Sequence, residues 1–383
     1  MNKTGGIQSY WNLHKSKENE AKPSSIFEVP LFTDSHITGE FRGESVPYSI
    51  LNLVPWHTGS GNIAEAMMLR VEWFLNTERS YDLDTDNSSY HGGWAPDEIA
   101  ALMSLTLGVR VKAGGVVREY GGYHSDPLGT PRASEKVAPT YAAKMTRPIV
   151  PNAIKTVNIT NAFNFGKLHE LSEENYVALI RSARMYQDAL WMVESEPELA
   201  WLMLISAIET AASYWDKEIY TPAMKLKASK PELYSKLEAQ GGDELCNLVA
   251  VHIEKSLGAT SKFVKFCLEH LPEPPKERPR DWAQIKWSKT GFRKTLTQLY
   301  DYRSSALHGG IPFPAPLCRA PDQTETDMPP SEKGMLGLAS HSLGATWSAK
   351  DLPISANTFF EFAHGVLNNW VQSSLGNKKP TSD

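Results

Sequence analysis

The sequence predicts a mixed fold, in which an N-terminal α+β domain is followed by an all-helical bundle. Three observations carry this prediction. Up to about residue 160, apolar residues form short β-prone runs that prolines interrupt. From Ser172 onward they recur every three or four positions, which is typical of amphipathic helices. The chain has 383 residues, which is enough for two domains with a buried core in each.

The expected domain limits follow from these changes in pattern. Residues 1–25 are expected to form a flexible leader, residues 26–160 an α+β sensor or regulatory domain, and residues 376–383 a polar tail. Residues 170–375 carry enough amphipathic helices to form a bundle with a core of its own. Within the bundle, residues 311–353 hold seven prolines and are expected to be an insertion that is functional or mobile.

The N-terminal domain is expected to begin with three short strands, at residues 26–32, 46–54 and 64–75. The third segment leaves a helix open, but its apolar residues alternate, which favours a strand. Pro96 with two acidic neighbours opens a short helix that runs through Leu105. Residues 108–120 alternate and contain an Ala-Gly-Gly turn, which predicts a hairpin.

The C-terminal half is expected to contain six helices. Ser172 is typical of a helix N-cap, and the two glutamates after it favour the N-terminal end of a helix. Residues 229–242 are expected to be a weakly structured connection, and the prolines between 272 and 279 enforce an extended break. The expected helices are residues 173–193, 197–215, 244–257, 262–271, 290–307 and 358–375.

Composition and charge argue against several classes of protein. With a formal net charge of -5, the chain lacks a globally basic surface for nucleic acid. Cys246, Cys267 and Cys318 form no CxxC pair, which favours a reducing compartment over a disulfide framework. No apolar run approaches the ~20 residues that a membrane span needs, and the polar N-terminus lacks the apolar core of a signal peptide. We therefore expect a cytoplasmic protein without a membrane partner.

Three histidines of the N-terminal domain, His57, His91 and His124, lie next to aromatic residues and glycines. They could belong to a metal site, but no other His or Cys stands at the spacing of metal ligands. Structural or loop histidines are the favoured interpretation. Neither a metal nor another cofactor is expected.

The segment from Leu299 to Gly310 holds one arginine and one histidine, Arg303 and His308, at the end of an amphipathic helical pattern. Two glycines and a proline after the histidine end the predicted helix. Five positions apart on an ideal helix, the two side chains point about 140° away from each other. They converge on one substrate if His308 lies in a frayed last turn, or if a second copy of the chain supplies the other half.

An arginine, a polar residue, three further positions and a histidine at the end of a helix resemble the motif of the HEPN superfamily. The segment Tyr302-Arg303-Ser304 through Leu307-His308-Gly309 is similar to the Apea-like branch of that superfamily. The apolar helical segment from Trp201 to Glu209 is similar to the same branch. The resemblance covers roughly residues 170–372. It implies a helical bundle that forms a homodimer and, in many members, cuts RNA without a metal ion.

The resemblance implies that Arg303 and His308 are catalytic. Ser304 occupies the polar position that is Asn, Asp or His in many members of the superfamily, so this chain carries a weaker polar group there. The arginine fork suits two phosphate oxygens and the charge of the transition state. An imidazole titrates near neutral pH, so His308 can move the proton. The products would carry a 2′,3′-cyclic phosphate and a 5′-hydroxyl.

A structural interpretation of both residues stays open. The arginine would then serve an ion pair, and the histidine would place a favourable charge at the negative end of the helix. Glu209 likewise has two interpretations, as a helix-end ion pair or as a pocket carboxylate that faces Arg303. Tyr302 could stack on a base or pack in the core, and core packing is favoured.

A basic stripe leads into the motif. Between Lys276 and Arg303 stand eight basic and three acidic residues, a balance that a phosphate-bearing ligand favours. The alternative is a solvated helix face. The residues of this stripe that we assign to RNA binding are Lys289, Arg293 and Lys294.

The leading hypothesis is a metal-independent endoribonuclease that acts as a toxin or anti-phage effector. Its expected partners are RNA, a second copy of the chain, and an antitoxin or a phage-derived trigger. The alternative is a catalytically silent HEPN module for nucleotide or RNA binding or for dimerisation. A metal-dependent enzyme built on the N-terminal histidines is a third, weaker hypothesis.

Overall fold

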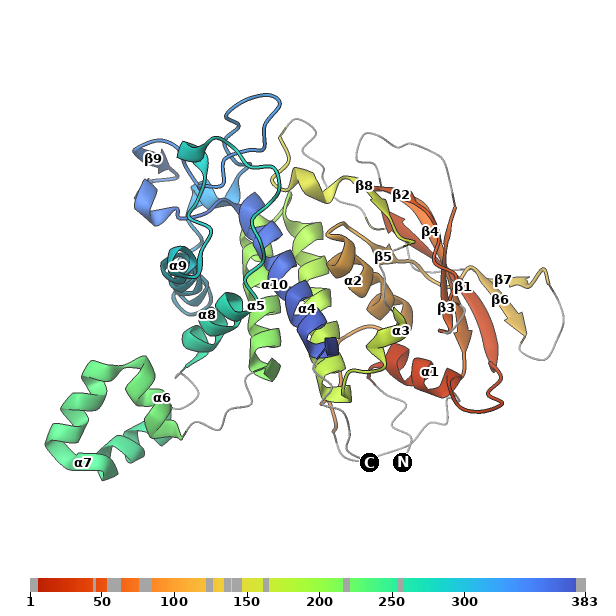
Figure 1. Cartoon of the computed structure of the whole chain (residues 1–383), viewed down its shortest axis with the longest axis horizontal. Helices are drawn as coiled ribbons and strands as arrows, with labels where there is room; N and C mark the ends of the chain where they lie inside the picture. The colour runs from red at the N-terminus through yellow and green to blue at the C-terminus, as the bar shows by residue number, and fades with distance from the viewer. Residues whose placement is uncertain are drawn as a thin grey trace.

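The computed structural model describes residues 6–43, 46–53, 63–75, 85–121, 127–133, 139, 147–160, 165–215, 221–253 and 258–376. It confirms a mixed fold, with a β-sheet in the N-terminal region and helices through most of the rest. Figure 1 shows the sheet on one side of the molecule and the long helices beside it. None of the helices in these ranges is long and apolar enough to cross a membrane.

The main sheet is built around strand β1, which contacts three other strands antiparallel. The expected strand at 64–75 is confirmed as β4, whose residues Met67, Leu69 and Val71 are fully buried. That alternation places one face of β4 in the core. In spatial order the strands are β3 (Tyr48–Asn52), β4 (Ala64–Trp73), β1 (Ser25–Thr33), β6 (Arg118–Gly121) and β7 (Thr130–Pro131), with β5 (Lys112–Ala113) also paired to β1.

The expected hairpin at 108–120 is wrong. β5 and β6 both pair with β1 rather than with each other. Between them the chain stays beside β1, because the backbone N–H of Gly114 donates to Pro30 O at 2.8 Å and that of Val117 donates to Glu28 O at 3.0 Å. A side chain at Gly114 would meet Pro30 and the ring of Phe32, so the glycine permits this close approach.

Residues 8–16, assigned above to a flexible leader, form helix α1 (Gln8–Ser16), so that expectation is wrong for them. Leu13 is buried, and Asn12 closes the end of β4 with its side chain. The Asn12 amide donates to Glu72 O at 2.9 Å, and its oxygen accepts from the backbone N–H of Phe74 at 2.8 Å. The polar sequence of residues 1–25 gave no sign of this helix, whose partners Tyr48, Glu72 and Glu98 are distant in the chain.

Helix α2 (Ala95–Leu107) confirms the helix expected at 96–105 and separates the sheet from the bundle. Its fully buried Glu98 accepts hydrogen bonds from the backbone N–H groups of Gln8 and Ser9, at 2.9 and 2.8 Å. Nε2 of His91 lies 2.9 Å from the same carboxylate. His91 thus has a structural setting, whereas His57 and His124 fall outside the described residues.

Five of the expected helices are present as the bundle. α4 begins after Ser172, whose hydroxyl accepts from the backbone N–H of Asn175 at 3.3 Å. At the centre, the ring of Trp201 stacks on Phe359 at 4.9 Å and its indole N–H donates to Leu317 O at 2.9 Å. The bundle helices are α4 (Glu173–Met192), α5 (Pro197–Trp215), α8 (Ala259–Glu269), α9 (Lys289–Gly309) and α10 (Ala356–Gly376).

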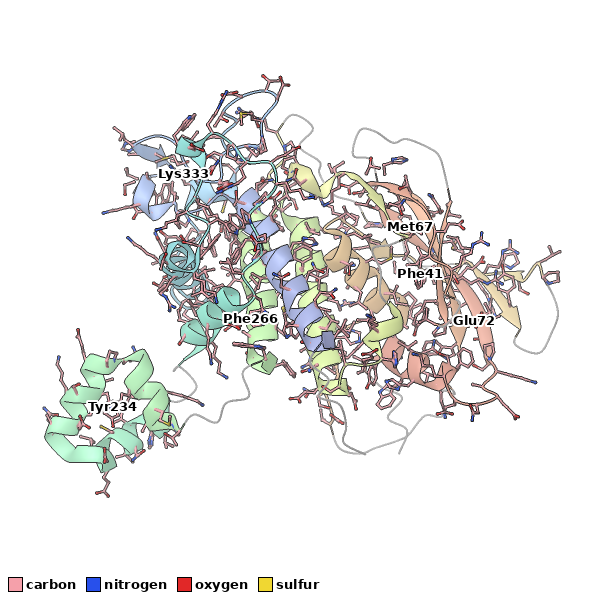
Figure 2. All side chains as sticks on the ribbon, in the orientation of Figure 1. Phe41, Met67, Glu72, Tyr234, Phe266 and Lys333 are labelled. Atoms are coloured by element: carbon pink, nitrogen blue, oxygen red, sulfur yellow. The ribbon has the colours of Figure 1, made fainter. Side chains whose placement is uncertain are left out.

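Residues 229–242 are not a weakly structured connection. They belong to two helices, α6 (Pro222–Ser229) and α7 (Pro231–Ile253), and the second kinks where Gly242 has φ of 62°. α7 also takes in the expected helix at 244–257 as far as Ile253. This pair stands apart from the bundle in Figure 1 and has a small core of its own, around Tyr234 in Figure 2.

The insertion at 311–353 has short elements of its own. A two-stranded hairpin forms its outer part, and 3-10 turns lie on both sides of it. Its elements are η4 (Ala315–Cys318), β9 (Ala339–Ser342), β10 (Ala345–Ser348) and η5 (Ala349–Asp351). The remaining short elements of the chain are β2 (His36–Thr38) paired with β8 (Thr156–Asn158), η1 (Pro151–Ala153), α3 (Phe165–Leu168) and η3 (Asp281–Ala283).

One hydrophobic core continues from the sheet through α2 into the bundle. A buried ion cluster crosses the same junction. Nη1 of Arg110 lies 2.7 Å from Asp34 Oδ2, and Nη2 lies 3.8 Å from Glu194 Oε1. The Arg110 Nε–H also donates to Leu190 O at 2.7 Å. The division of the chain near residue 160 stays a prediction, but the packing at that junction is continuous.

Candidate active site

Helix α9 carries the motif and follows the expected limits closely. It begins after Ser288, whose hydroxyl accepts from the backbone N–H of Gly291 at 3.1 Å, and it ends at Gly310 with φ of 63°. The buried residues Phe292, Leu296 and Leu299 fix which face of α9 is turned to the core. That packing determines where every motif side chain lies.

Arg303 and Glu209 form an ion pair between α9 and α5. Nη2 of Arg303 lies 2.7 Å from Glu209 Oε2, and the two side chains are 18% and 24% exposed. The hydroxyl of Tyr300 donates to the other carboxylate oxygen at 2.7 Å. Glu209 therefore faces Arg303 in an ion pair, which fits both of its interpretations. Tyr300 was missed, although it stands three positions before Arg303 and so on a neighbouring part of the same helix face.

The Arg303 guanidinium is partly desolvated and incompletely bonded. Its carbon lies 5.5 Å from the centre of the Tyr300 ring, within cation–π range. Burial, reinforced by the hydrogen bond to Glu209, raises the pKa of Tyr300, so its hydroxyl remains a donor. In the described part of the chain, the buried Nε of Arg303 has no hydrogen-bond partner. A buried donor of this kind favours an acceptor such as a phosphate oxygen.

His308 lies in the last turn of α9, exposed to solvent. The helix is regular to Gly309 and is closed by the backbone N–H of Ile311, which donates to Ser305 O at 3.2 Å. The last turn is therefore not frayed, and within one chain His308 points about 140° away from Arg303. This geometry argues against the first route to convergence, and a site shared between two copies stays a prediction. Ser304 lies half-buried on the same helix.

Tyr302 packs as the favoured interpretation expects. Its hydroxyl donates to Asp351 O at 2.7 Å and accepts from the amide of Gln298 at 2.8 Å. Its ring meets Phe313 edge-on, with ring centres 6.2 Å apart. Tyr302 thus links the end of the insertion to α9 through its hydroxyl and packs its ring against Phe313.

The three residues assigned to RNA binding lie on the outer surface of α9. Arg293 and Lys294 are exposed, and Lys289 Nζ is 3.8 Å from Glu269 Oε2. Counting 100° per residue, Lys294 is about 180° from Arg303 but about 40° from His308. Lys289 and Arg293 lie about 40° and about 80° from Arg303, between it and the histidine, so only Lys294 is on the histidine's side alone.

A second group of ionisable residues lines a cavity of about 320 Å³ between the N-terminal region and the bundle. It includes Lys155, Tyr186, Glu361 and His364, and sequence reasoning named none of them. Burial lowers the pKa of His364 to about 4, with help from the charge of Lys155. Burial raises the pKa of Glu361, which accepts a hydrogen bond from Asn152. No local sequence pattern joins residues so far apart in the chain.

The low pKa of His364 predicts a pH-dependent stability. An unfolded histidine takes up a proton near pH 6.5, whereas folded His364 stays neutral until about pH 4. Between these two pH values the unfolded chain binds more protons than the folded chain. The stability associated with neutral, buried His364 is therefore complete above pH 6.5 and is lost as the pH falls toward 4. We expect His364→Gln to remove at most about 2 kcal/mol of the stability lost between pH 7 and pH 5. Urea denaturation at pH 7 and pH 5 measures the free energy of unfolding of the parent and the variant.

The control for this experiment is His341→Gln, which replaces an exposed histidine of β9. It should leave the pH profile of the parent protein unchanged. Equal slopes for the parent and His364→Gln between pH 7 and pH 5 would show that His364 titrates alike in the folded and unfolded chain.

The described residues contain no group of three or more His, Cys, Asp or Glu side chains that could hold a metal ion. The chain matches no known family model, no curated protein and no solved structure.

Proposed function

We propose that the C-terminal helices are a HEPN-like bundle and that the protein is a metal-independent endoribonuclease. One observation supports this most directly: Glu209 and Tyr300 hold Arg303 in place while its buried Nε has no partner. Buried donors in folded proteins usually have a partner, so an Nε without one can serve an oxygen of a bound ligand. The motif histidine, His308, remains exposed on the same helix.

The proposed reaction gives a role to Arg303 and to the His308 side chains of two copies. Arg303 binds non-bridging oxygens of the scissile phosphate and stabilises the charge of the transition state. The 2′-oxygen attacks phosphorus, its proton passes to one His308, and the bond to the 5′-oxygen breaks. The His308 of a second copy gives a proton to that leaving oxygen. The products are a 2′,3′-cyclic phosphate and a 5′-hydroxyl.

The biological role that we propose, a toxin or anti-phage effector, rests on the family resemblance. The test of the activity is incubation of the purified protein with total RNA and transfer RNA in EDTA, followed by analysis of the RNA ends. Cyclic-phosphate ends support the proposal. Binding of RNA without cleavage favours the silent module, an alternative that the separation of Arg303 and His308 within one chain also supports.

We further propose that the site forms across a homodimer. Leu307 and Ile311 flank His308 and are 49% and 63% exposed, so apolar surface lies beside the motif. In a two-fold interface each residue of one copy can meet a different residue of the other. Arg303 of one chain and His308 of its partner would then line one cleft. This removes the separation of about 140° that a single helix imposes.

Mixing two inactive variants tests the shared site. Arg303→Ala and His308→Ala proteins, dissociated together and reassociated, should cleave RNA about tenfold or more faster than either protein alone. They should remain slower than the parent, because each mixed dimer lacks one of the two His308 side chains that the reaction uses. Each mixed dimer keeps one Arg303 and one His308 on different chains. Light scattering under the cleavage conditions is measured in parallel. A monomer that still cleaves RNA would contradict the shared site.

A further inference from the structure

A cavity of about 430 Å³ lies between the first half of α9 and the residues around η5. Three lysines line it: Lys286 before α9, Lys333 in the insertion and Lys350 in η5. Phe292, Met335 and Leu352 give it an apolar floor. Figure 2 labels Lys333 at the end of the molecule that carries β9. The cavity contains neither Arg303 nor His308 and belongs to no site described above.

The described lining of the cavity contains no Asp or Glu. The two nearest acids in sequence are hydrogen-bonded to other groups, although the Asp351 carboxylate also interacts with the charge of Lys350. Both oxygens of Glu332 accept from Arg278, each at 2.7 Å. The Asp351 carboxylate accepts from the backbone and hydroxyl of Ser348, at 3.0 and 2.7 Å. A cavity with three cations and an apolar floor suits an anion joined to a planar ring.

The cavity is fastened to the motif helix. The amide of Gln298 donates to Lys350 O at 3.2 Å, and Tyr302 donates to Asp351 O at 2.7 Å. Thr295, which lines the cavity, stands eight residues before Arg303, or about 12 Å along the axis of α9. A short single-stranded segment can cover that distance. Lys333 is also held, because its ammonium group donates to Trp282 O.

We propose that this cavity is a nucleotide-binding subsite, in which Lys286, Lys333 and Lys350 hold a phosphate and the apolar floor contacts the base. The nucleotide belongs to the RNA strand that continues from the phosphate at Arg303. The assignment of the nucleotide to an RNA strand rests on the proposed function, whereas the subsite itself does not. A free nucleotide offers the same chemistry, and the test separates the two.

The test measures binding apart from cleavage. The probe is a fluorescein-labelled single-stranded oligonucleotide with 2′-deoxy sugars, which cannot undergo attack by a 2′-hydroxyl. The variant is Lys286→Ala with Lys350→Ala, two exposed positions whose truncation leaves the core intact. We expect affinity to fall about tenfold at low salt, and the salt dependence of log K to become shallower by about two. Fluorescence anisotropy at several salt concentrations measures both the affinity and its salt dependence.

The matched control is Lys230→Ala with Lys236→Ala, which removes the same charge from exposed positions outside the cavity. It should change affinity less than about twofold. Lys286→Arg with Lys350→Arg keeps the charge and should retain most of the binding. Equal losses in the cavity variant and the control would overturn the proposal, since a general charge effect would then explain both.

A second arm uses adenosine monophosphate and measures the melting temperature. If adenosine monophosphate raises the melting temperature of the parent protein but not of the cavity variant, and the oligonucleotide does not bind, the cavity is assigned to a free nucleotide. No response to either probe overturns the subsite. Loss of binding in the variant of a protein that never cleaves RNA supports the subsite and counts against the proposed function. Cleavage of RNA, together with unchanged oligonucleotide binding in the variant, supports the proposed function and counts against the subsite.

Discussion

Arg303→Ala is expected to lower the rate of RNA cleavage by about 1,000-fold or more, because it removes the fixed positive charge that faces the phosphate in the transition state. His308→Ala is expected to lower it by about 100-fold or more, since a proton-transfer group is lost. Both variants should relieve any growth arrest that expression of the parent protein causes. The measurement is the initial rate on transfer RNA in EDTA, with circular dichroism to verify folding.

The control for these variants is Arg319→Ala, which removes an exposed arginine that pairs with Asp322 at 3.7 Å. It should cleave at the parent rate. If Arg303→Ala and His308→Ala keep native-like spectra and cleave RNA as fast as this control, the two residues have no catalytic role and the nuclease proposal is lost.

Arg110→Met should lower the free energy of unfolding by about 3–5 kcal/mol. Asp34 and Glu194 are 4% and 3% exposed, and the variant removes the buried cation beside them. The loss arises because two buried carboxylates keep their desolvation cost after their attraction to the guanidinium is gone. Urea denaturation of the two proteins measures the difference.

The matched control is Arg132→Met. Arg132 pairs with Glu119 at 2.6 Å, but the side chains are 58% and 38% exposed, so solvent screens the attraction. The expected change is below about 1 kcal/mol. A similar small change for Arg110→Met would mean that the buried cluster adds little to the junction between the sheet and the bundle.

The same junction bears on truncation of the chain. Residues 170–375 carry enough amphipathic helices for a core of their own, which by itself would predict a soluble protein after deletion of residues 1–160. Their removal would take away Arg110 and expose the face of α4 that α2 covers. We expect loss of solubility instead, because that face belongs to the continuous hydrophobic core.

The sequence by itself determined those elements whose signals are local. Ser172 and the two glutamates after it marked the start of α4, the alternation of Met67, Leu69 and Val71 marked β4, and two glycines marked the end of α9. Each signal acts through neighbouring residues, by a capping hydrogen bond, a strand period or a backbone conformation. Such preferences can be read without knowing what lies across the molecule.

Only the tertiary structure decided the pairings between distant segments. α1 forms where its polar sequence suggested a leader, because Asn12 and the start of the helix are bonded to β4 and Glu98. β5 and β6 pair with β1, which lies about eighty residues earlier in the chain, and not with each other. Arg303 and Glu209 stand 94 residues apart, and whether they meet depends on how α5 and α9 pack. The reason is physical: such contacts depend on the packing and burial of the whole chain, which no short stretch of sequence contains.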